Sequence, residues 1–109
     1  MNPVVVVHLF AAALAISLAI PLIRRRVKMN PWYGVRIPAA FASEASWFEI
    51  NRHGGWLLLA WGAALAATAA VGAFLPRRDW VAYDWTALAV VMVGLAAVIG
   101  LILRRARKA

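Results

Sequence analysis

Residues 55–75, GWLLLAWGAALAATAAVGAFL, contain no charged side chain and are almost entirely apolar. A helix needs about 20 such residues to cross the hydrocarbon core of a bilayer, so this stretch predicts a transmembrane helix. Small residues recur in it at a spacing of four, at Gly62, Ala66 and Ala70. Because helices in lipid associate through close van der Waals contact, this spacing predicts the central helix of a bundle.

Two further apolar runs flank this stretch, at residues 3–23 and 85–103. The chain has 109 residues and is 65% hydrophobic, more than a soluble domain of this size can bury. The first run carries its basic residues after the apolar part and not before it, unlike a secretory signal, so we expect it to be retained. The sequence therefore predicts an all-α integral membrane protein, a single domain with three transmembrane helices.

The distribution of basic residues predicts the orientation of the bundle. Of the twelve Lys and Arg residues, six lie between the first two helices and four in the tail 104–109. The loop at residues 76–84 holds two, Arg77 and Arg78. By the positive-inside rule, the first loop and the C-terminus face the cytoplasm and the N-terminus faces out. The net charge of +8 is thus explained by topology and anionic lipid, and no nucleic-acid partner is expected.

Polar and aromatic residues near the outer side have local explanations. His8 is expected near the outer headgroups, with a proton-relay or ligand role as the alternative. Asp84 is expected to cap the third transmembrane helix. Trp80, Tyr83 and Trp85 are expected to form an aromatic belt at the outer interface.

The first loop, residues 24–54, is much longer than a connector between antiparallel helices requires. Asn30 and Pro31 favour a turn, and Gly34 permits a sharp bend. Pro38 restrains the residue before it to an extended conformation. The segment from Asn30 to Pro38 therefore predicts a compact non-helical turn.

A short helix is expected after this turn. Ser43 is placed to cap a helix that begins at Glu44. Trp47 and Ile50 lie on one apolar stripe of that helix, and the glycine pair at 54–55 is expected to end it. These features predict a short amphipathic helix in the headgroup layer on the cytoplasmic side, between the first two transmembrane helices.

The charges of the loop are expected to satisfy one another. An unpaired charge at the headgroup layer is costly, so Arg36 is predicted to pair with Glu44 or Glu49. On the helix itself, Glu49 is spaced to pair with Arg52 or His53.

The sequence lacks the residue patterns of the common catalytic and metal sites. It has no cysteine, no HExxH motif, no clustered Asp and no Gly-rich phosphate loop before a helix. We therefore expect no metal ion, no cofactor, no catalytic residue and no enzymatic activity.

The loop resembles that of a known family. The residues that carry the resemblance are Asn30, Tyr33, Gly34, Arg36, Pro38, Ser43, Glu44, Trp47, Asn51, Arg52 and Gly54 or Gly55. This spaced pattern is similar to the signature loop of the SdpI-like (SdpI/YfhL) membrane proteins, whose founding member protects a sporulating Bacillus from its own toxic peptide. Ile37 departs from the pattern, because the family usually has Thr there, and the founding member has additional helices before the shared unit.

The resemblance implies a protein of the bacterial cytoplasmic membrane that confers resistance to, or senses, a membrane-active peptide or envelope stress. It implies a peptide toxin or a cytoplasmic regulator as partner, in addition to membrane lipids. With the neighbouring Glu49 and His53 added, the candidate ligand- or partner-binding residues are Asn30, Tyr33, Gly34, Arg36, Pro38, Ser43, Glu44, Trp47, Glu49, Asn51, Arg52 and His53.

Two other functions remain open at this point. Arg36, Arg52 and His53 supply donors that would suit an anionic lipid headgroup or a lipid-linked phosphate. Alternatively, the small-residue helix faces suit a homo-oligomer or an accessory subunit of a larger membrane assembly. A transporter is disfavoured, because no charged residue lies inside the apolar spans.

Overall fold

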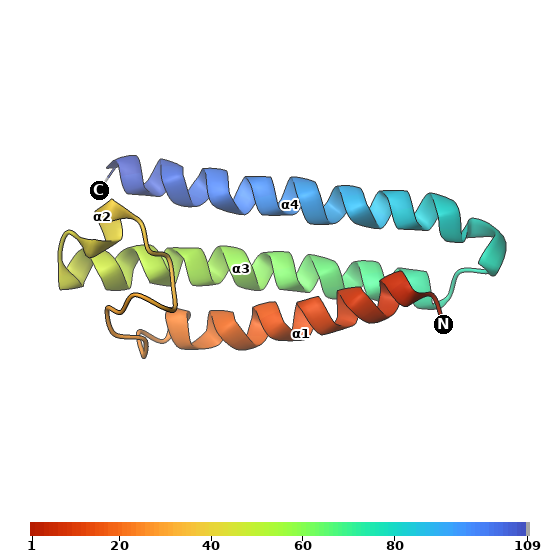
Figure 1. Ribbon diagram of the computed structural model, residues 1–109, viewed down its shortest axis with the longest axis horizontal. Helices are drawn as coiled ribbons and strands as arrows, with labels where there is room; N and C mark the ends of the chain where they lie inside the picture. The colour runs from red at the N-terminus through yellow and green to blue at the C-terminus, as the bar shows by residue number, and fades with distance from the viewer. Residues whose placement is uncertain (109) are drawn as a thin grey trace.

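The computed structural model describes residues 1–108 and consists of helices, with the longest non-helical connection at residues 24–37. In order they are α1 (Pro3–Ile23), α2 (Pro38–Phe41), α3 (Glu44–Ala73), the 3-10 turn η1 (Arg77–Asp79) and α4 (Trp80–Lys108). The three long helices are long and apolar enough to cross a membrane, and α3 lies between α1 and α4 (Figure 1). The predicted all-α class with three membrane-spanning helices is confirmed.

The two ends of the bundle differ in what they carry. The segment between α1 and α3 lies at the same end as the C-terminus, and the N-terminus lies at the other end with the connection between α3 and α4 (Figure 1). We call the first of these the loop end and the second the N-terminal end.

α1 and α3 approach each other closely where α3 has glycine. A Cβ atom on Gly62 would lie 2.9 Å from Ile16 Cγ1 and 3.2 Å from Ala15 Cβ, both in α1. A Cβ atom on Gly55 would lie 3.1 Å from the carbonyl oxygen of Ala19. The predicted role of α3 as the central helix, packed through small residues, is confirmed.

The small residues that are buried are not quite the predicted set. Gly55, Gly62 and Ala69 are buried, whereas Ala66 is half-buried and Ala70 is exposed. Gly55, Gly62 and Ala69 are spaced by seven residues, which keeps these three on one face of α3. The spacing of four shifts around the helix, so Ala70 leaves the contact with α1.

α4 is packed most deeply near the N-terminal end. Its buried side chains are Tyr83 and Ala87, which form a small core with Val5 of α1 and Ala69 of α3. The hydroxyl of Tyr83 also donates a hydrogen bond to the carbonyl oxygen of Thr68 at 2.7 Å. These contacts fasten α4 to the other helices at this end.

The helix that begins at Glu44 does not end at the glycine pair, contrary to the prediction. α3 continues through it to Ala73, so the expected interfacial helix is the first part of a single long helix. Both glycines are places of close approach: a Cβ atom on Gly54 would lie 2.7 Å from Val35 Cγ2, and one on Gly55 would lie 2.9 Å from Ile23 Cγ1. Packing against the loop and α1 offsets the roughly 0.5–1 kcal/mol that glycine costs inside a helix.

Asp84 does not cap the third long helix, contrary to the prediction. α4 already begins at Trp80, so Asp84 lies inside it. Its Oδ1 accepts a hydrogen bond from Asn2 Nδ2 at 2.8 Å, and Asn2 itself caps α1 by accepting from the backbone N–H of Val4. Asp84 therefore joins the start of α1 to α4.

The aromatic belt is only partly as expected, and His8 faces inward. Tyr83 is buried in the bundle, while Trp85 is 70% exposed and available to the membrane interface.

His8 is only 5% exposed, and its Nδ1 lies 2.9 Å from the carbonyl oxygen of Val4. The ring is therefore held inside the bundle and does not project toward the headgroups.

Candidate functional site in the loop between α1 and α3

Asn30 organises the turn at the start of the loop. Its Oδ1 accepts from the backbone N–H groups of Trp32 at 2.8 Å and Tyr33 at 2.7 Å, and its Nδ2 donates to the carbonyl oxygen of Lys28 at 2.7 Å. This is the turn geometry that Asn side chains favour. The hydroxyl of Tyr33 donates to the carbonyl oxygen of Leu18 in α1, and burial raises the pKa of Tyr33, which favours the protonated phenol that this bond requires. The predicted turn is therefore present and fastened to α1.

Gly34 and Asn51 form the main junction between the loop and α3. Gly34 has a φ of 114°, which favours glycine, and a Cβ atom there would lie 2.5 Å from Asn51 Oδ1. That oxygen accepts the backbone N–H of Val35 at 2.5 Å. Asn51 Nδ2 donates to the carbonyl oxygen of Trp47 at 2.9 Å. Asn51 is only 1% exposed, so its amide holds the loop in place and is not available to a ligand.

Trp47 is the centre of a small apolar core beneath the loop. It is fully buried with Ala40 of α2 and Ile50 of α3, and Ala106 of α4 packs against the same cluster. Its indole Nε1 donates to the carbonyl oxygen of Val27 at 2.8 Å. The stripe predicted for Trp47 and Ile50 is therefore present, but it faces protein and not the headgroup layer.

The two helix starts in the loop follow the predicted local rules. Ile37 is extended, with φ −108° and ψ 158°, and Pro38 follows as the first residue of α2. Ser43 caps α3, since its Oγ accepts the backbone N–H of Ser46 at 3.0 Å. Pro38 and Ser43 thus position α2 and α3 and have local structural roles.

The predicted pairing of Arg36 with Glu44 or Glu49 is wrong. Arg36 Nη1 donates to the carbonyl oxygen of Pro31 at 2.5 Å. Glu49 forms its ion pair with Arg105 of α4, and within residues 1–108 this is the sole ion pair. Arg105 is close enough because α4 continues as a helix beyond its apolar run, which brings the basic tail beside the first turns of α3.

Replacing Glu49 with Gln is expected to lower the free energy of unfolding by less than about 1 kcal/mol. In this ion pair the side chain of Glu49 is 47% exposed and that of Arg105 is 50% exposed, so water and salt screen the attraction between them. Thermal unfolding in mild detergent at low and high salt checks this, and the difference between the variant and the wild type should shrink as salt is added. A large loss that salt does not change would show that the pair is shielded from solvent.

The charged candidates divide into two groups. Arg36, Glu44 and Arg52 are exposed on the surface of the loop end. His53 is half-buried and lies apart from Arg36, beside basic residues of the α4 tail: Arg104, Arg105 and Lys108. The tail residues were not among the predicted site residues, although their position after an apolar run could have suggested that they share an end with the loop.

An apolar cavity of about 370 Å³ lies beneath the turn. The loop contributes Trp32, Tyr33 and Val35 to its lining, and α1, α3 and α4 all contribute to the rest of the wall. The loop end therefore combines an apolar cavity with exposed charges. Within residues 1–108 there is no group of three His, Asp or Glu side chains placed to hold a metal ion.

Comparison with known proteins gives one match. A family model described as the SdpI/YfhL protein family matches residues 26–104, from the basic start of the loop to the end of the apolar part of α4. No match is found among curated proteins or among solved structures. The matched range covers more than half of the chain and includes the whole junction of Gly34, Asn51 and Trp47. The chain belongs to the SdpI/YfhL protein family.

Proposed function

We propose that this protein is a non-enzymatic component of the bacterial cytoplasmic membrane that confers resistance to, or senses, a membrane-active peptide or envelope stress. The observation that carries the proposal is the set of hydrogen bonds that folds the loop and joins it to α1 and α3. Asn30 and Asn51 fix the shape of the loop through hydrogen bonds, and Gly34 lets its backbone lie against Asn51. Arg36 of the loop and Arg52 of α3 are exposed at this end. A surface fixed in advance binds a partner at a lower entropic cost than a flexible loop.

The partner that suits this surface is a cytoplasmic regulator or a peptide segment with acidic and apolar side chains. Arg36 and Arg52 are exposed, as are Arg24, Arg25 and Arg26 at the start of the loop. Glu44 and Glu49 are the exposed acidic residues at this end, and Glu49 is paired with Arg105. Complementary charge steers encounter and fixes register. The apolar cavity beneath Trp32 is large enough to receive a side chain of the partner.

The distribution of charge supports an orientation with the loop end in the cytoplasm. The basic residues of the loop and of the C-terminal tail lie at one end of the bundle (Figure 1). Basic residues near helix ends are retained on the cytoplasmic side. In this proposed orientation the N-terminus lies outside, where an extracellular peptide would first meet the helices.

Deleting the gene in its native host is expected to raise sensitivity to membrane-active peptides or to alter an envelope-stress transcript. The wild-type gene should restore the original behaviour, and the double variant Arg36→Gln/Arg52→Gln should not. If these two arginines act as anchors of the interface, partner binding should weaken by about thirtyfold or more. The matched control is Arg77→Gln/Arg78→Gln, which removes the same charge at the N-terminal end and should complement fully.

Two results would overturn this proposal. One is a deletion strain that shows no change in peptide sensitivity and no change in any transcript. The other is full complementation by Arg36→Gln/Arg52→Gln when membrane levels of the variant match those of the wild type, because the exposed arginines would then have no part in the function.

A further inference from the structure

A basic depression of about 210 Å³ lies between α3 and α4 at the loop end. His53 of α3 and Arg104, Arg105 and Lys108 of α4 surround it. Arg105 is paired with Glu49, but within residues 1–108 neither Arg104 nor Lys108 has an ion-pair partner. The depression therefore has an excess of positive charge where the helices leave the apolar part of the bundle.

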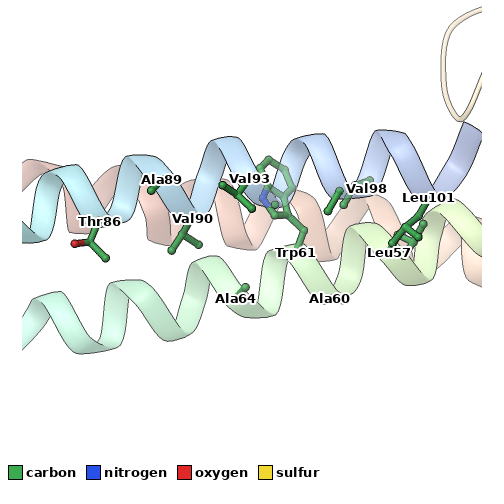
Figure 2. A pocket seen from close by; sticks show the side chains of 12 residues that line it. Leu57, Ala60, Trp61, Ala64, Thr86, Ala89, Val90, Val93, Val98 and Leu101 are labelled. Carbon is green, nitrogen blue, oxygen red and sulfur yellow. The ribbon is translucent and has the colours of Figure 1, made fainter.

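An apolar groove of about 590 Å³ runs along the same two helices. Figure 2 shows Ala64 of α3 opposite Val90 and Val93 of α4, with the Trp61 indole extending from α3 toward α4. A Cβ atom on Gly94 would lie 2.5 Å from Trp61 Cδ1, so the indole is wedged against α4. Ala60 and Ala64, which lie on either side of Trp61 along α3, have small side chains, and these leave space between α3 and α4.

The depression and the groove adjoin each other at Leu101, which lines both. Along α4 the groove extends from Leu101 to Thr86, which corresponds to about 22 Å of helix. One leaflet contributes about 15 Å of hydrocarbon depth, half of a bilayer core of about 30 Å. The groove is long enough to hold an acyl chain of the leaflet at the loop end along its full length.

We propose that an anionic phospholipid binds here, with its phosphate in the basic depression and an acyl chain in the groove. The guanidinium of Arg104 suits phosphate oxygens, and basic pockets between transmembrane helices are suited to anionic headgroups. An empty groove would forfeit the dispersion contacts of the side chains that line it. This site is separate from the exposed Arg36 and Arg52 of the proposed function.

The test uses the full-length protein in mild detergent, with lipid binding followed by native mass spectrometry. Phosphatidylglycerol should be retained in preference to phosphatidylcholine with the same acyl chains. The double variant Arg104→Gln/Lys108→Gln should bind phosphatidylglycerol about thirtyfold more weakly. Arg77→Gln/Arg78→Gln removes equal charge at the other end and should bind as the wild type does.

A second pair of variants tests the groove. Ala60→Phe fills it and should weaken binding of phosphatidylglycerol, whereas Ala70→Phe makes the same change at an exposed position of α3 outside the groove and should not. Inorganic phosphate should compete poorly, because it lacks the chain. These readouts are independent of peptide protection, so either proposal can fail while the other stands.

Four results would overturn the lipid site. They are equal retention of the two lipids, unchanged affinity in Arg104→Gln/Lys108→Gln, and competition by inorganic phosphate at the lipid's own concentration, which would indicate a site for free phosphate. The fourth is a dimer of the wild type that Ala60→Phe dissociates, since a second copy of the chain would then cover the groove.

Discussion

Replacing Asn51 with Leu is expected to detach the loop from α3 and to lower the free energy of unfolding by about 2–3 kcal/mol. Leu is similar in size but can neither accept nor donate a hydrogen bond. The backbone N–H of Val35 would lose the acceptor that now lies at 2.5 Å, and a Leu side chain in the buried position of Asn51 would offer it no replacement. Thermal unfolding in mild detergent, followed by far-UV circular dichroism, measures the loss of stability.

The same variant should also expose the loop to protease. Limited trypsin digestion after Arg36 should be faster than in the wild type, because the segment on either side of it would no longer be held. Arg52→Leu is the matched control: it introduces the same residue at the next position, which is exposed, and should change stability by less than about 0.5 kcal/mol. If Asn51→Leu had the same unfolding temperature and the same rate of cleavage as the wild type, the amide of Asn51 would not be what holds the loop to α3.

The three long helices were predictable from the sequence because lipid leaves the backbone few choices. A spanning segment must satisfy its own N–H and C=O groups, so an uncharged apolar run of sufficient length becomes a helix. The bounds predicted for the first run, residues 3–23, are those of α1. Hydropathy predicts which residues lie in hydrocarbon, and for α1 these are the same residues that form the helix.

Hydropathy does not predict where a helix ends once it has left the hydrocarbon. α3 begins at Glu44 and α4 ends at Lys108, both beyond the apolar runs at 55–75 and 85–103. Arg and Lys favour helix about as much as Leu does, so the charges at the edge of the membrane need not stop it. This extension is what brings Arg105 to Glu49, and an expectation based on apolar runs alone could not include that pair.

The candidate site shows a similar division between local and distant effects. Ser43 and Gly34 act through neighbouring backbone, so residue type and spacing were sufficient to predict them. Asn51 was identified as a candidate for binding a ligand or partner, but its Oδ1 accepts the backbone N–H of Val35, sixteen positions earlier in the chain. The sequence shows that a polar side chain needs hydrogen-bond partners. It does not show whether those partners come from the fold or from a ligand. Its amide is satisfied from within the protein, which leaves the exposed Arg36 and Arg52 for a partner.

Adding a methyl group at Gly72 is expected to loosen the N-terminal end of the bundle. A Cβ atom there would lie 2.2 Å from Tyr83 Cζ and 2.4 Å from its Oη, so the ring must move. Moving it breaks its hydrogen bond to Thr68 and disturbs the core that it shares with Val5. We expect Gly72→Ala to lower the free energy of unfolding by about 2–4 kcal/mol, measured by thermal unfolding in mild detergent. Gly100→Ala is the control, because nothing lies within 4 Å of a Cβ atom there.

A double-mutant cycle separates this clash from any other effect of the substitution. In a Tyr83→Ala background the ring is absent, so Gly72→Ala should cost nothing or should stabilise α3 by up to about 1 kcal/mol through helix propensity. The coupling free energy between the two sites should therefore be about 2 kcal/mol or more, which is the size expected for residues in direct contact. If Gly72→Ala cost as much without the ring as with it, the close approach of α4 to α3 would not depend on Tyr83.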